Sequence, residues 1–121
     1  MKILITGASG FIGSFIVEEA LRRGFETWAG VRASSSRKYL QDPRIHFINL
    51  DFSSEDQLVE ALAGHDFDYV VHAAGVTKCL HGEDFMRVNY IGTKNFVNAI
   101  LKVGLPLKRF IYMSSLSVFG A

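Results

Sequence analysis

The chain has 121 residues, of which 49% are hydrophobic and 21% charged, and its formal net charge is +1. The length suits one globular domain, and the near-zero charge gives no reason to expect nucleic acid or an anionic membrane surface as a partner. The single Cys79 excludes an internal disulfide and, with no apolar run of about 18 residues for a membrane span, leads us to expect a cytoplasmic protein.

Strand and helix signals alternate along the chain. Short β-rich apolar runs predict strands over residues 2–6, 26–31, 44–49, 68–73 and 108–113. Amphipathic patterns predict helices over residues 11–23, 55–63 and 83–103, the second opened by a capping box from Ser54 to Gln57. Because strands alternate with helices, we expect a doubly wound parallel sheet of the α/β class. No linker or repeat interrupts the pattern, which predicts a single domain over residues 1–121.

A glycine-punctuated turn follows the first predicted strand and precedes the first predicted helix. Gly7 lets the backbone turn out of the strand, Gly10 leaves room for a pyrophosphate, and Gly13 lets the helix pack closely on the sheet. The spacing Gly-x-x-Gly-x-x-Gly differs from the commonest fingerprint, so the position of the turn carries the prediction of a bound dinucleotide. The predicted cofactor contacts are Gly7, Ala8, Ser9, Gly10, Phe11, Ile12 and Gly13.

Further blocks follow later strands, at the edge where open α/β sheets bind ligands. Asp51 and Phe52 come after the third strand, where a carboxylate can accept a hydrogen bond; a solvated or helix-capping aspartate is the alternative. Small residues after the fourth strand let a cofactor lie against the backbone, although a simple strand-ending turn is the alternative. They are Ala73, Ala74 and Gly75.

The fifth strand leads into Ser114-Ser115-Leu116-Ser117-Val118-Phe119-Gly120. The hydroxyl of Ser115 can both donate and accept a hydrogen bond, so it can polarise a carbonyl or orient an alcohol. An ordinary serine at a strand end is the alternative. Asn89, a polar residue among apolar neighbours in the third predicted helix, is a further candidate, and a solvated helix position is its alternative.

These blocks, in this order and over the whole chain, resemble the extended short-chain dehydrogenase/reductase family, the NAD(P)-dependent epimerases and dehydratases. The resemblance implies a Rossmann-like fold and hydride transfer between a nicotinamide and a substrate carbinol or carbonyl carbon. It implies that Asp51 accepts from the adenine amino group and that Asn89 steadies the fourth strand and the active-site floor. It also implies that Ser115, five residues before Gly120, is catalytic and bonds the substrate oxygen. No metal is expected.

The family's general acid/base is a tyrosine with a lysine four residues later, which the resemblance places roughly 25 residues after Ser115. The chain reaches only Ala121, and Tyr90 with Lys94 lies in the wrong helix. We therefore expect an N-terminal, cofactor-binding part of a longer enzyme, truncated after the fifth strand, inactive alone and without its C-terminal substrate-binding part. The alternative is a non-catalytic NAD(P)-binding sensor or scaffold.

The cofactor prediction rests on the end of the second strand. An NAD-specific site usually has an acidic residue there, whereas this chain has Arg32 and no carboxylate. A guanidinium matches phosphate oxygens, so we expect Arg32 to bind the 2′-phosphate and NADP to be preferred over NAD. The alternative is a solvated basic loop. The resemblance also implies a homodimer of the full-length protein, formed through the helix over 83–103 and the next helix, and a small-molecule substrate.

Overall fold

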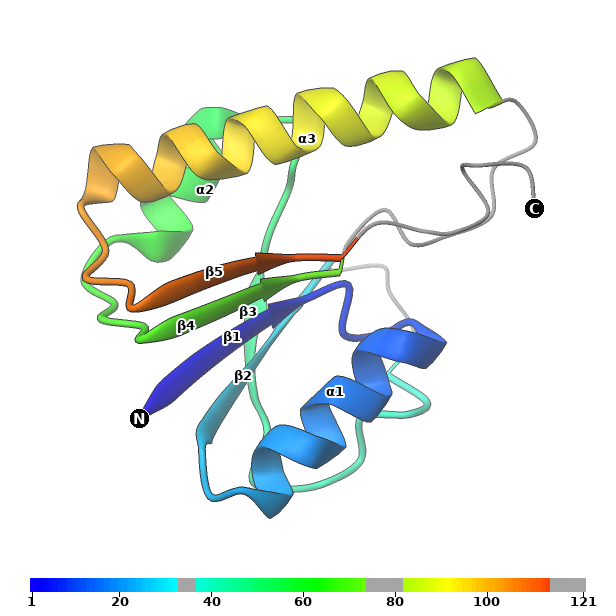
Figure 1. Ribbon diagram of the computed structural model, residues 1–121, viewed down its shortest axis with the longest axis vertical. Helices are drawn as coiled ribbons and strands as arrows, with labels where there is room; N and C mark the ends of the chain where they lie inside the picture. The colour runs from blue at the N-terminus through cyan, green and yellow to red at the C-terminus, as the bar shows by residue number, and fades with distance from the viewer. Residues whose placement is uncertain (33–36, 74–81, 114–121) are drawn as a thin grey trace.

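The structure is a computed structural model that describes residues 1–32, 37–73 and 82–113, with the backbone alone for residues 82–89 (Figure 1). The strands in this part of the chain are β1 (Lys2–Thr6), β2 (Glu26–Val31), β3 (His46–Asn49), β4 (Tyr69–His72) and β5 (Arg109–Tyr112). They form one parallel sheet in the order β3-β2-β1-β4-β5. β2 and β3 are added in turn on one side of β1, whereas β4 and β5 are added on its other side. The strand order therefore reverses between β1 and β4.

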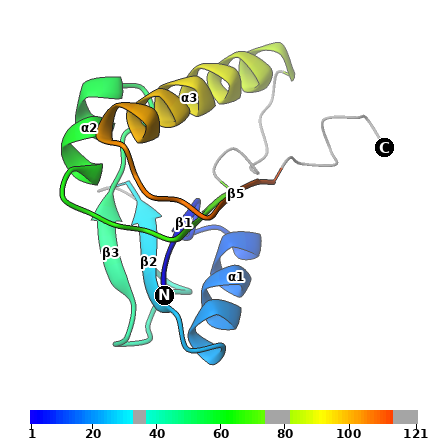
Figure 2. The same ribbon diagram turned by 60° about the vertical axis from the view of Figure 1, so that its left-hand side comes forward.

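Helices cover both faces of this sheet, as Figure 2 shows. α1 (Phe11–Arg22) lies on one face, whereas α2 (Glu55–Leu62) and α3 (Gly82–Val103) lie side by side on the other. Strands that alternate with helices on both faces confirm the predicted doubly wound α/β class.

β1 divides the hydrophobic core into two parts. Ile3 and Ile5 pack with Val17 of α1 on one face, whereas Leu4 belongs to the core on the other face, with Phe96 of α3. Leu4 and Ile5 are completely buried. A strand buried on both faces needs apolar residues at every position, which explains why this run shows no alternation with polar residues.

Most element boundaries match the predictions to within a residue or two. Glycines with a positive φ follow all three described helices and end them: Gly24 at 84°, Gly64 at 81° and Gly104 at 72°. β3 begins at His46, later than the predicted residue 44. The cause is a turn in which Asp42 accepts hydrogen bonds from the backbone N–H groups of Arg44 (2.9 Å) and Ile45 (3.2 Å).

The predicted capping box at the start of α2 forms only in part. Ser54 Oγ accepts a hydrogen bond from the Gln57 backbone N–H at 3.2 Å. The Gln57 side chain does not return to Ser54, as the motif predicts. Its Nε2 donates to the Asn49 carbonyl (2.9 Å) and its Oε1 accepts from the Asp51 N–H (2.8 Å). Gln57 therefore ties α2 to the segment that follows β3.

β5 lies at one edge of the sheet. Within the described residues it pairs only with β4, and all four of its residues are exposed. They include Phe110, Ile111 and Tyr112, of which the last two are nearly half exposed. An apolar edge strand of this kind is a template for pairing with another chain.

We therefore expect the purified chain to self-associate through β5 at high micromolar concentration. Ile111→Lys should shift it towards monomer, because a charged side chain on an edge strand opposes pairing. Phe15→Lys is the matched control, since Phe15 is an exposed apolar residue of α1, and it should leave association unchanged. Analytical ultracentrifugation measures both. A strictly monomeric wild-type chain contradicts the prediction.

Candidate functional site

The turn between β1 and α1 is built around a close backbone contact. Gly7 has φ of 64°, and its carbonyl accepts a hydrogen bond from the Gly10 N–H at 3.1 Å. A Cβ added to Gly13 would lie 2.1 Å from that same carbonyl oxygen and 2.9 Å from Ala8 Cα. Gly13 is therefore required for the fold. The nearest atoms belong to the turn itself, whereas we had expected Gly13 to allow close packing of the helix on the sheet.

The N-terminus of α1 is open. Its N-cap is Gly10, which provides no side-chain cap, and the first turn contains no acidic residue. A Cβ on Gly10 would meet only the Gly7 oxygen, at the ordinary contact distance of 3.4 Å. Phe11 and Ile12 are 66% and 43% exposed, and the first N–H groups of an α-helix have no hydrogen-bond partner within the helix. Such a helix end favours an anion.

A small open pocket of about 70 Å³ brings several predicted site residues together. Gly7 and Ser9 contribute from the turn, Arg32 from the end of β2, and Phe52 from the segment after β3. Gly30 also lines it, and a Cβ there would lie 2.7 Å from Leu50 Cδ1. Gly30 was not predicted, although a glycine inside a strand is a signal of close approach.

Asp51 is held in a local turn beside this pocket. Its Oδ1 accepts hydrogen bonds from the N–H (3.0 Å) and the Oγ (2.6 Å) of Ser53. These bonds, and then the positive charge of Arg32, lower the pKa of Asp51 below its ordinary value. The Asp51 N–H donates a hydrogen bond to Gln57 Oε1, as described above. Asp51 is therefore an ionised acceptor with a fixed backbone, and Gln57 is a contributor that sequence reasoning missed.

A chain of buried hydrogen bonds crosses the sheet between β1 and β4. The Ala73 N–H donates to Thr6 Oγ1 at 3.1 Å, and Thr6 Oγ1 lies 2.7 Å from His72 Nδ1. His72 Nε2 lies 3.1 Å from Thr93 Oγ1 of α3. His72 is 2% exposed, and burial lowers its pKa to about 4. The imidazole is therefore neutral at pH 7. The sequence signal was a histidine in an apolar strand, to which we had assigned no role.

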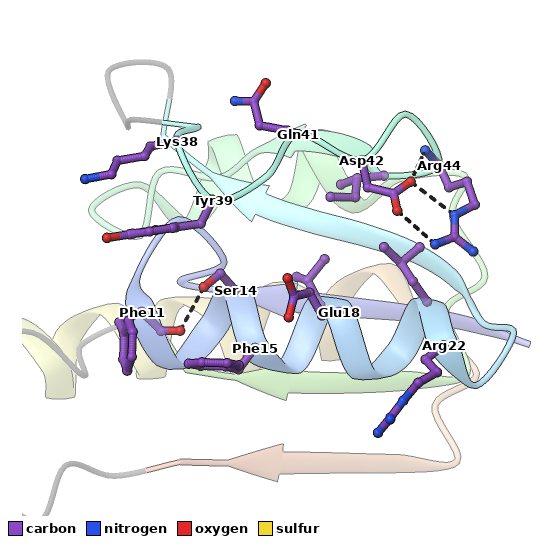
Figure 3. A pocket seen from close by; sticks show the side chains of 13 residues that line it. Phe11, Ser14, Phe15, Glu18, Arg22, Lys38, Tyr39, Gln41, Asp42 and Arg44 are labelled. Atoms are coloured by element: carbon purple, nitrogen blue, oxygen red, sulfur yellow. Dashed lines mark hydrogen bonds and ion pairs between the residues drawn. The ribbon is translucent and has the colours of Figure 1, made fainter.

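A second, larger pocket of about 810 Å³ lies between α1 and the segment after β2 (Figure 3). Phe11 and Phe15 line it from α1, and Tyr39 lines it from the other side. Asp42 and Arg44 form a salt bridge at one end, with Nη2 and Oδ2 2.8 Å apart, and this pairing lowers the pKa of Asp42 to about 2. Of the predicted site residues, Phe11 is the one that this pocket contains.

Several predicted residues stay predictions. Ala74, Gly75 and Ser115 lie outside the described residues, and Asn89 lies in α3 with its backbone alone described. Tyr90 is 65% exposed on α3. The described residues contain no group of three His, Cys, Asp or Glu able to hold a metal. None of the helices in this part of the chain is both long and apolar enough to cross a membrane.

Comparison with known proteins places these features in context. The NAD dependent epimerase/dehydratase family matches residues 3–121. Sterol-4-alpha-carboxylate 3-dehydrogenase, decarboxylating, from Bos taurus is 34% identical over 97% of this chain and 31% of its own length. UDP-glucose 4-epimerase from Klebsiella pneumoniae is 32% identical over 99% of this chain and 93% of its own length.

Solved structures share the fold. The crystal structure of WbmH from Bordetella bronchiseptica, in complex with NAD+, aligns with a TM-score of 0.72 at 29% identity. The alignment covers 92% of this chain and 38% of WbmH. The chain thus spans less than half the length of WbmH and of the bovine dehydrogenase.

Two alanine substitutions should separate the roles of the glycines. Gly13→Ala should lower the free energy of unfolding by roughly 3 kcal/mol or more, because its methyl group overlaps the Gly7 carbonyl. Gly10→Ala should change it by less than about 1 kcal/mol, yet weaken dinucleotide binding by placing a methyl group at the helix N-terminus. Urea denaturation and calorimetric titration with NADPH measure the two effects. Equal loss of stability in both variants would count against this assignment.

The buried His72 should make stability depend on pH. Its pKa falls from an ordinary 6.5 to about 4 in the folded chain, so between these values the unfolded chain binds the extra proton. Its contribution is complete above pH 6.5 and is lost as the pH falls towards 4, by roughly 3 kcal/mol. Urea denaturation at pH 7 and pH 4.5 measures the loss, which should be smaller in His72→Gln. The same pH dependence in both proteins would show that His72 is not its source.

Proposed function

Because this chain belongs to the NAD dependent epimerase/dehydratase family, we propose that it is the cofactor-binding part of an NAD(P)-dependent oxidoreductase, epimerase or dehydratase. The observation that carries the proposal is the open N-terminus of α1. It follows the strand at which the sheet order reverses, beside the pocket lined by Gly7, Arg32 and Phe52. Open α/β sheets bind dinucleotides at such a reversal.

The residues of this chain would hold and orient the cofactor. The N–H groups at the start of α1 bind the pyrophosphate, and Asp51 accepts from the adenine amino group. Small residues after β4, Ala73, Ala74 and Gly75, let the cofactor lie against the backbone, and Asn89 steadies the floor. When bound, the nicotinamide supplies the hydride donor or acceptor. Ser115 then orients the substrate oxygen.

We propose that NADP is preferred over NAD. Arg32 lines the small pocket at the end of β2, where a 2′-phosphate would extend from the adenosine ribose. The positive charge of Arg32 lowers the pKa of Asp51, and the negative charge of Asp51 partly offsets that of Arg32. A dianionic phosphate would compete well with a single carboxylate for the guanidinium, because it offers more charge and more acceptor oxygens.

The test compares NADPH and NADH affinities by calorimetric titration. Arg32→Ala should weaken NADPH binding roughly 10- to 100-fold, the value of a lost charge-assisted hydrogen bond, and leave NADH binding nearly unchanged. Arg22→Ala is the matched control, because Arg22 is an exposed arginine that pairs with Glu19 near the other end of α1. Equal losses for both nucleotides in Arg32→Ala would refute the phosphate contact. If wild type binds neither nucleotide, the proposed function itself fails.

The competing function is an NAD(P)-binding sensor or scaffold without catalysis. We propose that the protein is an enzyme and not a sensor, because a protein that only binds the cofactor does not need the Ser115 hydroxyl to orient a substrate. The source gene should therefore encode a Tyr-x-x-x-Lys segment roughly 25 residues after Ser115, with the rest of the substrate site. Sequencing the reading frame checks this. A continuation without that tyrosine would favour the sensor.

The remaining proposals concern assembly and location. We propose a homodimer, supported by the exposed apolar side chains of Tyr90, Val97 and Leu101 on α3. This homodimer is proposed for the full-length protein, in which Leu101→Glu should shift the dimer towards monomer. Analytical ultracentrifugation of the full-length protein measures this. A cytoplasmic location and a small-molecule substrate likewise stay proposals.

A further inference from the structure

The ladder between β1 and β4 ends in an unusual way. Its last paired residues are Thr6 and His72. Beyond them the Ala73 N–H donates to the side-chain oxygen of Thr6 instead of a backbone carbonyl. On the other side of β4 the Met113 N–H donates to the His72 carbonyl, so pairing with β5 continues. A hydroxyl group therefore takes the place of a ladder carbonyl at the carboxyl ends of β1 and β4, where the sheet order reverses.

The imidazole of His72 uses both of its nitrogens. Nδ1 faces Thr6 Oγ1 at 2.7 Å and Nε2 faces Thr93 Oγ1 at 3.1 Å. A neutral imidazole has one donor and one acceptor, which these two hydroxyl groups match. Aromatic rings surround it, with centroids at 5.0 Å (Phe96) and 5.6 Å (Tyr112). A ring held this tightly fixes the distance between its two partners.

The same part of α3 also contacts the small pocket. Asn95 Nδ2 donates to the Phe52 carbonyl at 2.8 Å, and a Cβ on Gly92 would lie 3.2 Å from Phe52 Cβ. The Phe52 and His72 rings are themselves neighbours, with centroids 5.3 Å apart. One turn of α3, residues 92–95, therefore contacts Phe52, which lines the small pocket, and His72, which lies at the end of the β1–β4 ladder.

We propose that His72 is a positioning residue of the dinucleotide site, which joins α3 to the carboxyl ends of β1 and β4 through Thr93 and Thr6. This rests on the proposed function, because it deepens the description of that site. His72 itself touches no cofactor. It acts through Thr6, which immediately precedes Gly7, and through the backbone at Ala73, so a shift of α3 reaches both segments that leave these two strands. Buried polar groups with all partners satisfied fix a single arrangement in this way.

A purely structural role predicts something different. A buried histidine that only fills the core would change stability when its partners are removed, but not the affinity of the folded protein. Thr93 provides the sharper test, because it lies in α3, on the side of His72 away from Thr6. Thr93→Val keeps the shape of the side chain and removes the hydroxyl, whereas Thr93→Ser keeps the hydroxyl.

The experiment measures NADPH and NADH affinities of the full chain by calorimetric titration, together with stability by urea denaturation. Thr93→Val should weaken binding of the preferred nucleotide about five-fold, the value of one hydrogen bond, and Thr93→Ser should stay within about two-fold of wild type. Thr27→Val is the matched control. Thr27 is fully buried, and its hydroxyl donates to the Phe25 carbonyl at 3.1 Å, away from this network. This control should lose stability without losing affinity.

The spectrum of the ¹⁵N-labelled imidazole gives a second readout. In wild type the two nitrogens of His72 should report one fixed neutral tautomer, which Thr93→Val should mix and Thr93→Ser should restore. Wild-type affinity in Thr93→Val, with an unchanged tautomer, would overturn the positioning role while leaving the proposed function intact. If wild type binds neither nucleotide, the proposed function fails and this inference fails with it.

Discussion

The contact between Gly13 and the carbonyl of Gly7 is the constraint on which the candidate site depends. It brings the first turn of α1 against the turn that leaves β1, closer than any side chain would allow. The direction of α1 follows from this contact, and with it the position of Val17 in the core on that face of the sheet. Backbone packing therefore sets the orientation of the α1 N-terminus, which has no side-chain cap.

Much of the fold could be predicted because its signals are local. The apolar run at Ile3-Leu4-Ile5 indicated a strand. Gly24 and Gly64 end helices at the expected places, because glycine adopts a positive φ at little cost. The start of β3 was misplaced because Asp42 draws Arg44 into a turn through its side chain. A propensity pattern indicates that residues 44 and 45 suit a strand. It does not show that the Asp42 carboxylate takes the Arg44 N–H and the Asp42 carbonyl takes the Ile45 N–H.

The site was less predictable, because its interactions join elements far apart in the sequence. Gln57 looked like a capping residue, and its actual partners at Asn49 and Asp51 depend on how α2 packs beside β3. His72 was one residue of an apolar predicted strand, and its contact with Thr93 depends on how α3 packs on this face of the sheet. Periodicity and motif spacing carry no information on which of two hydroxyl groups will face an imidazole.

The sheet order has a consequence for how the protein folds. β1, α1, β2 and β3 are close in sequence and share one core, whereas the ladder between β1 and β4 joins residues 66 positions apart, as in the Thr6–His72 pair. Closing so long a loop lowers the conformational entropy of the chain before the new contacts stabilise it. We therefore expect the β1–β4 ladder to form late in folding. The proposed dinucleotide site begins at Gly7, directly after the Thr6 end of that ladder. A dinucleotide that binds there would favour chains in which the ladder has formed, and would therefore stabilise the completed fold selectively.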